Sequence, residues 1–432
     1  MSNKYIDGTG LGHLWSKIKS YVSSYTYSKK EIDEKMKIPG VIYGFHIDPG
    51  ESDPSAAVTY LEDAVGMTPA AMDYTAGTFN YGSWAKAFFM PKPCMLKYDG
   101  TVDYYLDPND YTKKEDGTTA SDVANTDYEG NAMMEWGQNG YKIWYKIVPT
   151  DSNNGADVYI SNKQQDTDYH CWSFYDCDGT IKDHFYTAIY NGSKISSKLR
   201  SLSGQTCSTY TNMSTEYSLA TANNTTSSVH WCMETYADWV LINLLLILIS
   251  KSLNSQTAFG YGYAYNNPSA ISTGTGDTKG LFWGESTGEY LVKVFGMENR
   301  WGNILRRIVG WNINSGVSAI KLTYGTDDGS TKTGYNTTGS ATGYLMSGVT
   351  LTSSGYISKQ YFSDKGFFTP AAVSGSDSTY YSDYNYSVSS SGFAALVGGY
   401  WSDGLYAGAF CVSLSGSPSR SYSYFGSSVS FR

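Results

Sequence analysis

The side chains best suited to metal chemistry in this sequence are histidines and cysteines in its first half. His170, Cys171, Cys177 and His184 carry the nitrogen and sulfur atoms that bind zinc in proteins. Their spacing matches no zinc motif, and the chain contains no Cys-x-x-Cys pair. We therefore interpret them as residues packed in or near the core, and we expect neither a metal ion nor a cofactor.

Acidic side chains offer a second kind of chemistry. Residues 176–179, Asp-Cys-Asp-Gly, lack the downstream ligands of an EF-hand and predict a turn instead of a calcium loop. Glu135, Glu234, Glu285 and Glu298 are scattered, and the sequence does not place two of them at the separation that a glycosidase requires.

Three arginines between residues 295 and 311 could hold an anion. Trp301, Leu305 and Ile308 recur there at helical spacing, and an arginine pair beside a glutamate and several tryptophans is typical of a structural network. We therefore favour a structural role for this segment. The arginines are Arg300, Arg306 and Arg307.

Strong catalytic motifs are scarce. Neither the phosphate-binding Gly-x-x-x-x-Gly-Lys-Ser/Thr pattern nor His-Glu-x-x-His occurs, and the chain has only five histidines. We therefore predict that the protein is not an enzyme.

Composition narrows the class of partner. The chain of 432 residues carries a net charge of -9, only 16% charged residues, 40 Tyr and 45 Gly. Nucleic-acid binding needs clustered Lys and Arg, which are missing, so neither nucleic acid nor an anionic membrane surface is expected as a partner.

The N-terminus has no signal-peptide pattern. The most apolar run, Trp239 to Ile249, is shorter than the ~20 residues that span a bilayer, so it predicts a core helix and no membrane insertion.

The first forty residues form a separate unit in this interpretation. Leu11, Trp15, Ile18 and Val22 follow helical spacing and predict an amphipathic helix. Such a segment is too small to bury a core alone, so its apolar stripe must meet the rest of the chain or copies of itself. We favour copies and predict a homotrimer. Pro39-Gly40 marks the boundary to a second domain, residues 41–432.

The second domain has few predicted helices and many short strands. A cap at Asp53 with Pro54 predicts a short helix over residues 56–65, and a long helix is expected over residues 232–253. Together these elements predict a mixed α+β fold. The predicted strands are residues 87–90, 141–147, 156–160, 184–190, 320–324, 393–397 and 410–414.

The composition changes near the C-terminus. Residues 371–432 contain no Lys and no Glu, but they contain 18 Ser and 8 Tyr. Alternating apolar positions indicate that the segment is folded. Tyr, Ser, Gly and Asp at exposed positions are typical of adaptable binding surfaces, since Tyr offers a large amphipathic contact area at low entropic cost.

The residues of this segment carry a resemblance to a known family. Residues 397–410, Val-Gly-Gly-Tyr-Trp-Ser-Asp-Gly-Leu-Tyr-Ala-Gly-Ala-Phe, and the ending Ser-Ser-Val-Ser-Phe-Arg resemble the closing motif of receptor-binding proteins of bacteriophages that have the C-type lectin fold. Residues 234–311, with Met-Glu-Asn-Arg-Trp-Gly-Asn at 297–303, look like the same family in phages of gut bacteria and like the formylglycine-generating-enzyme subtype of that fold. The opening residues 7–19 are similar to the first helix of phage tail and fibre proteins.

Members of this family are often diversified by retroelements that mutate exposed codons of a C-terminal repeat. The resemblance implies a variable region at about residues 380–432, held by a fixed scaffold that consists of Gly398, Gly399, Trp401, Gly404, Ala407 and Gly408. The motif implies that Tyr400, Ser402, Asp403, Leu405 and Tyr406 are displayed to a ligand. Alternation and composition extend this set to Ser413, Ser415, Ser417, Tyr422, Ser423 and Tyr424.

The resemblance implies a tail-associated adhesin that binds a protein or glycan of the bacterial surface. Other tail proteins would hold its N-terminal helix, and the protein would be assembled in the host cytoplasm and carried on the virion. Two alternatives remain open, a glycan hydrolase on the same scaffold and a purely structural virion protein. An oxidase of the formylglycine-generating type would need a pair of C-terminal cysteines, and only Cys411 lies there.

Overall fold

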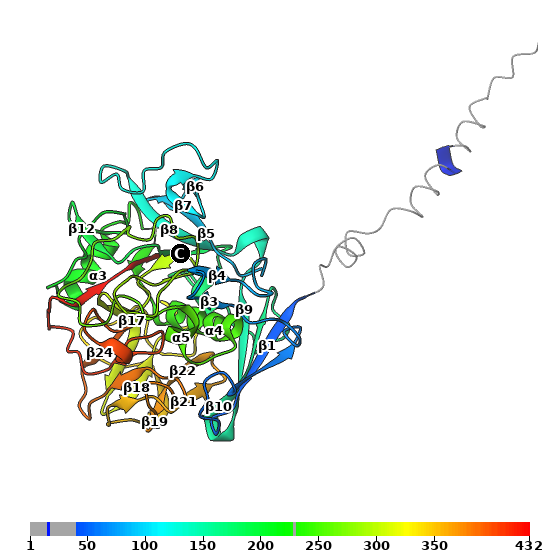
Figure 1. Cartoon of the computed structure of the whole chain (residues 1–432), viewed down its shortest axis with the longest axis vertical. Coiled ribbons are helices and arrows are strands. Elements are labelled where there is room, and N and C mark those ends of the chain that lie inside the picture. Colours follow the sequence, from blue (N-terminus) through cyan, green and yellow to red (C-terminus); the bar gives the residue numbers. More distant parts are fainter. Residues whose placement is uncertain (1–14, 18–39, 228–229) are drawn as a thin grey trace, which may run out of the picture. The chain divides into compact units, whose positions relative to one another are not determined.

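The computed structural model describes residues 15–17, 40–227 and 230–432 (Figure 1). The chain divides into two units, Met1–Val41 and Ile42–Arg432. Residues 15–17 are helical, and the rest of the predicted N-terminal helix lies outside the described residues. The larger unit contains the remaining elements.

Strands dominate the larger unit, with 33% of residues in strands against 11% in helices, which makes it an α+β protein. The first sheet has the order β2-β1-β10-β9 and is antiparallel throughout. Its strands are β1 (Ile42–Ile47), β2 (Val58–Glu62), β9 (Trp144–Thr150) and β10 (Gly155–Ser161). The predicted helix over residues 56–65 is wrong, because Val58 and Tyr60 alternate with exposed Thr59 and pair with β1 as a strand.

The second sheet has the order β14-β27-β11-β8-β5-β6-β7. The last strand of the chain lies inside it, paired with β11 and β14. Its strands are β5 (Lys92–Lys97), β6 (Val102–Asp107), β7 (Asp110–Lys114), β8 (Gly130–Trp136), β11 (Phe185–Ala188), β14 (Trp231–Met233) and β27 (Val429–Phe431). Residues 87–90, which we predicted as a strand, form turns instead, and β5 begins after Pro91.

The third sheet has the order β19-β18-β17-β24-β25-β23-β20, and β26 pairs in parallel with β17. Its strands are β17 (Leu305–Asn314), β18 (Val317–Ile320), β19 (Leu345–Thr350), β20 (Gly355–Tyr356), β23 (Tyr384–Tyr386), β24 (Phe393–Val397), β25 (Val412–Ser413) and β26 (Phe425–Ser427). The strand predicted over residues 393–397 is confirmed, the one over 320–324 ends at its first residue, and the one over 410–414 shrinks to two residues. The helical spacing of Trp301, Leu305 and Ile308 is misleading, since β17 begins at Leu305.

Four two-stranded ribbons complete the strands. They are β3 (Ala71–Asp73) with β4 (Thr78–Asn80), β12 (Ser193–Ile195) with β13 (Lys198–Arg200), β15 (Lys293–Val294) with β16 (Met297–Glu298), and β21 (Lys359–Ser363) with β22 (Phe367–Ala372). Single turns of 3-10 helix occupy Gln138–Gly140, Asp151–Asn153, Trp172–Phe174 and Gly404–Tyr406.

Three α-helices are described, α3 (Met213–Thr221), α4 (Tyr236–Ser250) and α5 (Ser255–Phe259). Every residue of α4 is buried, which confirms a core helix, but the helix is shorter than the predicted residues 232–253 because Trp231–Met233 pair with β27 as strand β14. Thr235 and Asp238 form a capping box that starts it. Figure 1 shows α4 and α5 side by side in the interior of the larger unit.

Candidate ligand-binding surface

The C-terminal segment surrounds a pocket of about 230 Å³ in which tyrosine, with four of the eleven lining residues, is the most frequent residue type. Strand β23 supplies Tyr386, the turn after β24 supplies Tyr400 and Asp403, and the segment after β25 supplies the other side. We call this cavity the tyrosine pocket. Its lining consists of Leu305, Tyr386, Tyr400, Asp403, Ser413, Ser415, Gly416, Arg420, Tyr422, Tyr424 and Phe425.

Two groups of tyrosines with ring contacts meet at this pocket, the first stacked and the second in tilted and edge-to-face contacts. Tyr400 stacks on Tyr424 with ring centroids 4.3 Å apart, and Tyr422 stacks on Tyr424 at 5.3 Å with an interplanar angle of 2°. The second group, which we call the tyrosine cluster, consists of Tyr356, Tyr384, Tyr386 and Tyr406; the rings of Tyr384 and Tyr406 lie 4.4 Å apart. Tyr386 belongs to both the pocket and the cluster, so one aromatic surface runs across both.

A glycine-rich turn fixes the position of Tyr400. Gly398 and Gly399 have positive φ angles of 93° and 77°, a conformation that glycine adopts without steric cost. A Cβ atom at Gly399 would lie 2.7 Å from the Cβ of Ala407, so the two ends of the turn also pack too closely for a side chain there. Trp401 points inward and packs with Tyr263 and Ile304. The turn is therefore held rigidly while Tyr400 faces the pocket.

The side chain of Asp403 hydrogen-bonds back to the start of this turn, and its carboxyl group lines the pocket. Its Oδ2 accepts the backbone N–H of Tyr400 at 3.0 Å, and its Oδ1 accepts the Tyr386 hydroxyl at 3.4 Å. Only 9% of the residue is exposed. Burial raises the pKa of Asp403 to about 7, which the two hydrogen bonds lower only in part.

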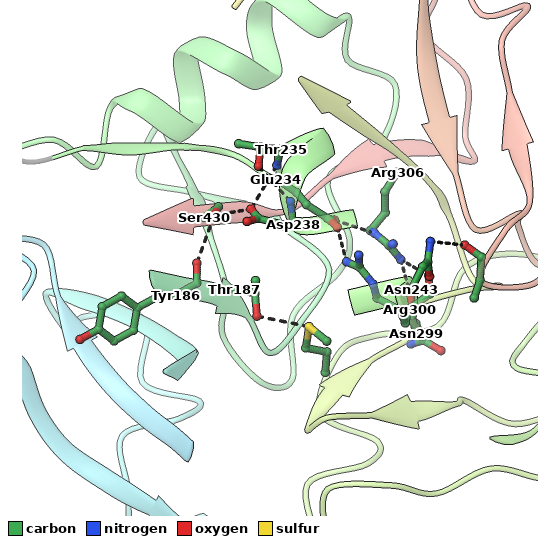
Figure 2. A network of polar contacts seen from close by, with 12 residues as sticks. Tyr186, Thr187, Glu234, Thr235, Asp238, Asn243, Asn299, Arg300, Arg306 and Ser430 are labelled. Carbon is green, nitrogen blue, oxygen red and sulfur yellow. Dashed lines mark hydrogen bonds and ion pairs between the residues drawn. The ribbon is translucent and has the colours of Figure 1, made fainter. Parts of the chain in front are cut away.

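A buried network of polar groups surrounds Glu234 (Figure 2). Glu234, which precedes α4, forms ion pairs with Arg300 and with Arg306, the latter at 3.2 Å between Oε2 and Nε. Arg306 Nη1 also donates to the carbonyl of Arg300 at 2.5 Å, and that carbonyl packs against Gly398, where a Cβ would lie 2.9 Å from it. The network thus supports the first glycine of the turn.

A second buried ion pair ties the end of the chain to the same helix. Arg432 donates to Asp238 Oδ1 at 2.7 Å, and Ser430 donates to Asp238 Oδ2 at 3.0 Å. Arg307 pairs with Glu216 at 2.7 Å. The three arginines that could have clamped an anion are thus occupied by internal carboxylates, in keeping with a structural network.

The structure brings six of the predicted display positions to one cavity. They are Tyr400, Asp403, Ser413, Ser415, Tyr422 and Tyr424. Tyr406 is exposed in the tyrosine cluster and Ser402 is exposed on the turn, while Leu405, Ser417 and Ser423 are half-buried outside the pocket lining. Among the predicted scaffold positions, Gly398, Gly399, Trp401, Ala407 and Gly408 are buried, and Gly404 is half-buried.

Two display positions differ from the expectation of full exposure. Asp403 is buried because its carboxylate folds back onto the N–H of Tyr400. Ser413 is buried because β25 pairs with β24 on one side and with β23 on the other. Both still contribute polar atoms to the pocket wall.

Sequence reasoning missed several residues of this surface. Tyr356, Tyr384 and Tyr386 enter it through β20 and β23, and Arg420 lines the pocket beside Tyr424. Tyr210 extends it, since its N–H donates to the carbonyl of Tyr422 at 3.0 Å and its side chain is exposed. The one local signal was the alternation of tyrosine and asparagine in Tyr384-Asn-Tyr386, which places both tyrosines on the same face of a strand.

The histidine and cysteine candidates do not lie together as one group of potential metal ligands within the described residues. Cys177 instead lies with Asp176 and His230, whose potential ligand atoms are within 4.8 Å of one another. Asp176 already accepts Lys182 at 2.7 Å and contacts His230, so its charge is compensated. His170 stacks on Trp172, and Cys171 is buried. All six cysteines are free thiols.

The scattered glutamates likewise take structural positions. Glu135 accepts the hydroxyls of Tyr105 and Tyr186 at 2.9 and 2.8 Å. Glu234 and Glu298 line a cavity of about 10 Å³, which is no larger than a single water needs. Glu285 lies apart, in a cavity that also contains Glu289, Trp283 and Tyr290.

Residues 284–288 also match the Gly-x-Ser-x-Gly pattern of a nucleophile elbow, which the sequence reasoning overlooked. In the structure they lie in an irregular segment, without the strand before and the helix after that such an elbow requires. The match is therefore a coincidence of composition in a chain rich in glycine and serine.

Comparison of the chain with models of known protein families finds no matching family, and comparison with curated proteins finds no match. Within residues 15–17, 40–227 and 230–432, no helix combines the length and the apolar character needed to cross a bilayer.

Proposed function

We propose that this protein is a phage tail-associated receptor-binding adhesin whose C-terminal surface binds a component of the bacterial surface. The observation that carries the proposal is that six predicted display positions line one pocket. Two of them, Tyr400 and Asp403, belong to the closing motif, and the other four were added on alternation and composition. Tyrosine-rich surfaces on rigid scaffolds are suited to binding, because aromatic side chains give large contacts at low entropic cost.

The proposal includes a C-type lectin fold of the formylglycine-generating-enzyme subtype. The Gly-Gly-x-Trp turn and the return of β27 to a sheet that contains much earlier strands support it. It further includes a homotrimer assembled through residues 1–40, attachment of that segment to other tail proteins, assembly in the host cytoplasm and location on the virion. Display in several copies would raise a weak affinity through effective concentration.

The proposal treats the protein as non-enzymatic. Hydrolysis of a glycosidic bond uses two carboxyl groups flanking the bond. Asp403 is the single carboxylate among the described residues that line the tyrosine pocket. Release of reducing sugar from bacterial envelopes by the purified protein would favour the hydrolase alternative, and the cavity of Glu285 and Glu289 would then be the place to search.

The binding role is tested by removing two exposed tyrosines. Tyr406 and Tyr422 are 40% and 39% exposed, so the double variant Tyr406→Ala/Tyr422→Ala is expected to stay folded. Because tyrosine hot spots contribute about 2 kcal/mol or more, binding to a susceptible strain should fall at least about 30-fold. Binding of labelled protein to a panel of gut bacterial isolates measures this.

A control removes Tyr290, an exposed tyrosine that does not line the tyrosine pocket. Tyr290→Ala should bind as well as the unchanged protein. If Tyr406→Ala/Tyr422→Ala also bound the susceptible strain with unchanged affinity, the C-terminal surface would not be the receptor site.

Diversification makes a separate prediction about codons. Across a phage population, variation in residues 398–432 should concentrate at Tyr400, Ser402 and Tyr406, because their side chains leave the turn without supporting it. Gly398 and Trp401 should stay fixed, since both are packed inside. Deep sequencing of this locus measures the pattern, and uniformly low variation would leave an ordinary adhesin or a structural protein.

A further inference from the structure

We propose that the tyrosine pocket binds the cationic end of a lysine or arginine side chain of a protein receptor, with Asp403 as the counter-charge. The inference rests on the proposed receptor-binding function and names the chemistry of its ligand. It starts from a buried carboxylate that lies in the wall of a cavity.

Asp403 has hydrogen bonds but no cation. Its two acceptor contacts come from a backbone N–H and from a tyrosine hydroxyl at the long distance of 3.4 Å. It forms no ion pair with any lysine, arginine or histidine of the described residues, although Arg420 lines the same pocket. A cationic partner lowers the free energy of an ionised carboxylate that is buried without a counter-charge.

Three other deeply buried carboxylates of this chain have the cationic partner that Asp403 lacks, whereas Asp383 is fully buried and forms no ion pair within the described residues either. Glu216, Glu234 and Asp238 are each paired with arginine. In each case the arginine belongs to the same chain and is itself buried. Asp403 instead borders a cavity of about 230 Å³, far above the ~10–15 Å³ that one water needs, so a partner can enter from outside.

The pocket walls suit a cation on its way to the carboxylate. Tyr386 and Tyr400 line the pocket together with Asp403, and the face of a tyrosine ring attracts ammonium and guanidinium groups by about 0.5–2 kcal/mol. The chain shows the same pairing elsewhere, for example Lys293 Nζ at 3.6 Å from the ring centroid of Tyr111. A neutral sugar would stack on these rings as well, but it would leave the carboxylate charge without a counter-ion.

The charged and titratable groups near Asp403 set the expected pH dependence. Tyr386, Tyr400 and Tyr424 are neutral at physiological pH, since burial raises the pKa of each above its ordinary value. Cys411 is fully buried, and burial raises the pKa of its thiol well above the ordinary value. Arg420 is a permanent cation that lines the same pocket, and both Arg420 and Asp403 act on the pKa of Tyr424. Asp403 is thus the group that changes charge near neutral pH.

A cationic ligand requires the ionised form of Asp403. With a pKa of about 7 in the free protein, the ionised fraction rises roughly tenfold between pH 6 and pH 8. Affinity for a cation should therefore rise by about the same factor over that range, and the carboxyl group should titrate at lower pH when the ligand is bound.

The experiment uses the full chain and two small probes, N-acetyl-lysine methylamide and the same compound acetylated on Nζ. Ligand-observed NMR should detect binding of the charged probe, stronger at pH 8 than at pH 6, and none of the neutral probe. Asp403→Asn preserves the acceptor for Tyr400 N–H but should abolish binding of the charged probe and its pH dependence. Asp377→Asn, an exposed carboxylate beside Tyr356, is the matched control and should leave both unchanged.

Each alternative outcome overturns the inference. Equal binding of both probes, binding that survives Asp403→Asn with its pH dependence, or binding of methyl glycosides without the charged probe would exclude a cation at Asp403. These outcomes are distinguishable from failure of the proposed function, because loss of cell binding in Tyr406→Ala/Tyr422→Ala would still place the receptor site on this surface. If that variant binds cells normally, the receptor site itself is wrong.

Discussion

Glu234→Gln is expected to lower the free energy of unfolding by about 3–5 kcal/mol, because it leaves two buried arginines without their counter-charge. Arg300 and Arg306 are almost fully enclosed, so bulk water cannot solvate their charges in place of the carboxylate. A loss of this size is a large part of the stability of a typical domain. Chemical denaturation followed by tryptophan fluorescence measures it directly.

The pH dependence of the same pair gives an independent check. Burial acts to raise the pKa of Glu234, and the two arginines more than offset it, so the pKa lies below its ordinary value. A lowered pKa means that the stabilisation is present above the unfolded-state pKa of about 4.5 and is lost as the pH falls through the folded-state pKa. The difference between Glu234→Gln and the unchanged protein should therefore shrink in acid.

The control for this variant is Glu289→Gln, which changes an exposed glutamate. Exposed substitutions usually change stability by less than about 0.5 kcal/mol. If Glu234→Gln were equally mild, the buried network would contribute little, and the support it gives to the turn at Gly398 would have to come from packing alone.

Sequence patterns predicted elements of this fold where local signals were strong. The continuous apolar run of α4, with Thr235 as its cap, could only be a buried helix, and β24 was bounded by glycine and serine. The segment after Asp53 carried equally good capping signals, yet residues 58–62 form β2. There the pairing with β1 outweighed a local preference for helix, which is an effect that propensity alone does not contain.

The binding surface was predictable in composition but not in assembly. Tyr400, Tyr422 and Tyr424 stood out by residue type and by the closing motif. Tyr356 and Tyr386 did not, because they reach the surface only when β23 pairs in parallel with β25 and antiparallel with β20. Such long-range register is invisible in a single sequence.

The burial of Asp403 was also not predictable from the sequence. A motif position between two displayed residues is expected to point outward, and Ser402 does so. Asp403 turns inward because its carboxylate satisfies the N–H of Tyr400 three residues earlier, a local hydrogen bond that aspartate often makes in turns. The raised pKa that follows from this burial is what gives the pocket its expected response to pH.

Gly408→Ala is expected to cost about 2–4 kcal/mol and to disturb the tyrosine pocket. A Cβ at this position would lie 2.0 Å from Oδ1 and 2.3 Å from Oδ2 of Asp383, which is fully buried and has no room to withdraw. Overpacking of this kind typically costs 1–3 kcal/mol. Displacing Asp383 would also weaken the bond of 2.7 Å that its Oδ2 accepts from the N–H of Phe410, at a further cost of about 1 kcal/mol.

Gly404→Ala in the same turn separates steric clash from backbone strain. Gly404 has a positive φ of 59°, but a Cβ there would meet nothing closer than 3.6 Å, so its variant should cost only the ~1 kcal/mol of a left-handed alanine.

Asp383→Ala removes the obstructing carboxylate. In that background Gly408→Ala should therefore cost at least about 1 kcal/mol less than in the unchanged protein, a coupling that a double-mutant cycle measures. Additive costs would mean that the clash is absorbed elsewhere. A coupled result would establish that Gly408 is required for its closeness to Asp383, the residue that joins the glycine-rich turn to the strand carrying Tyr384 and Tyr386.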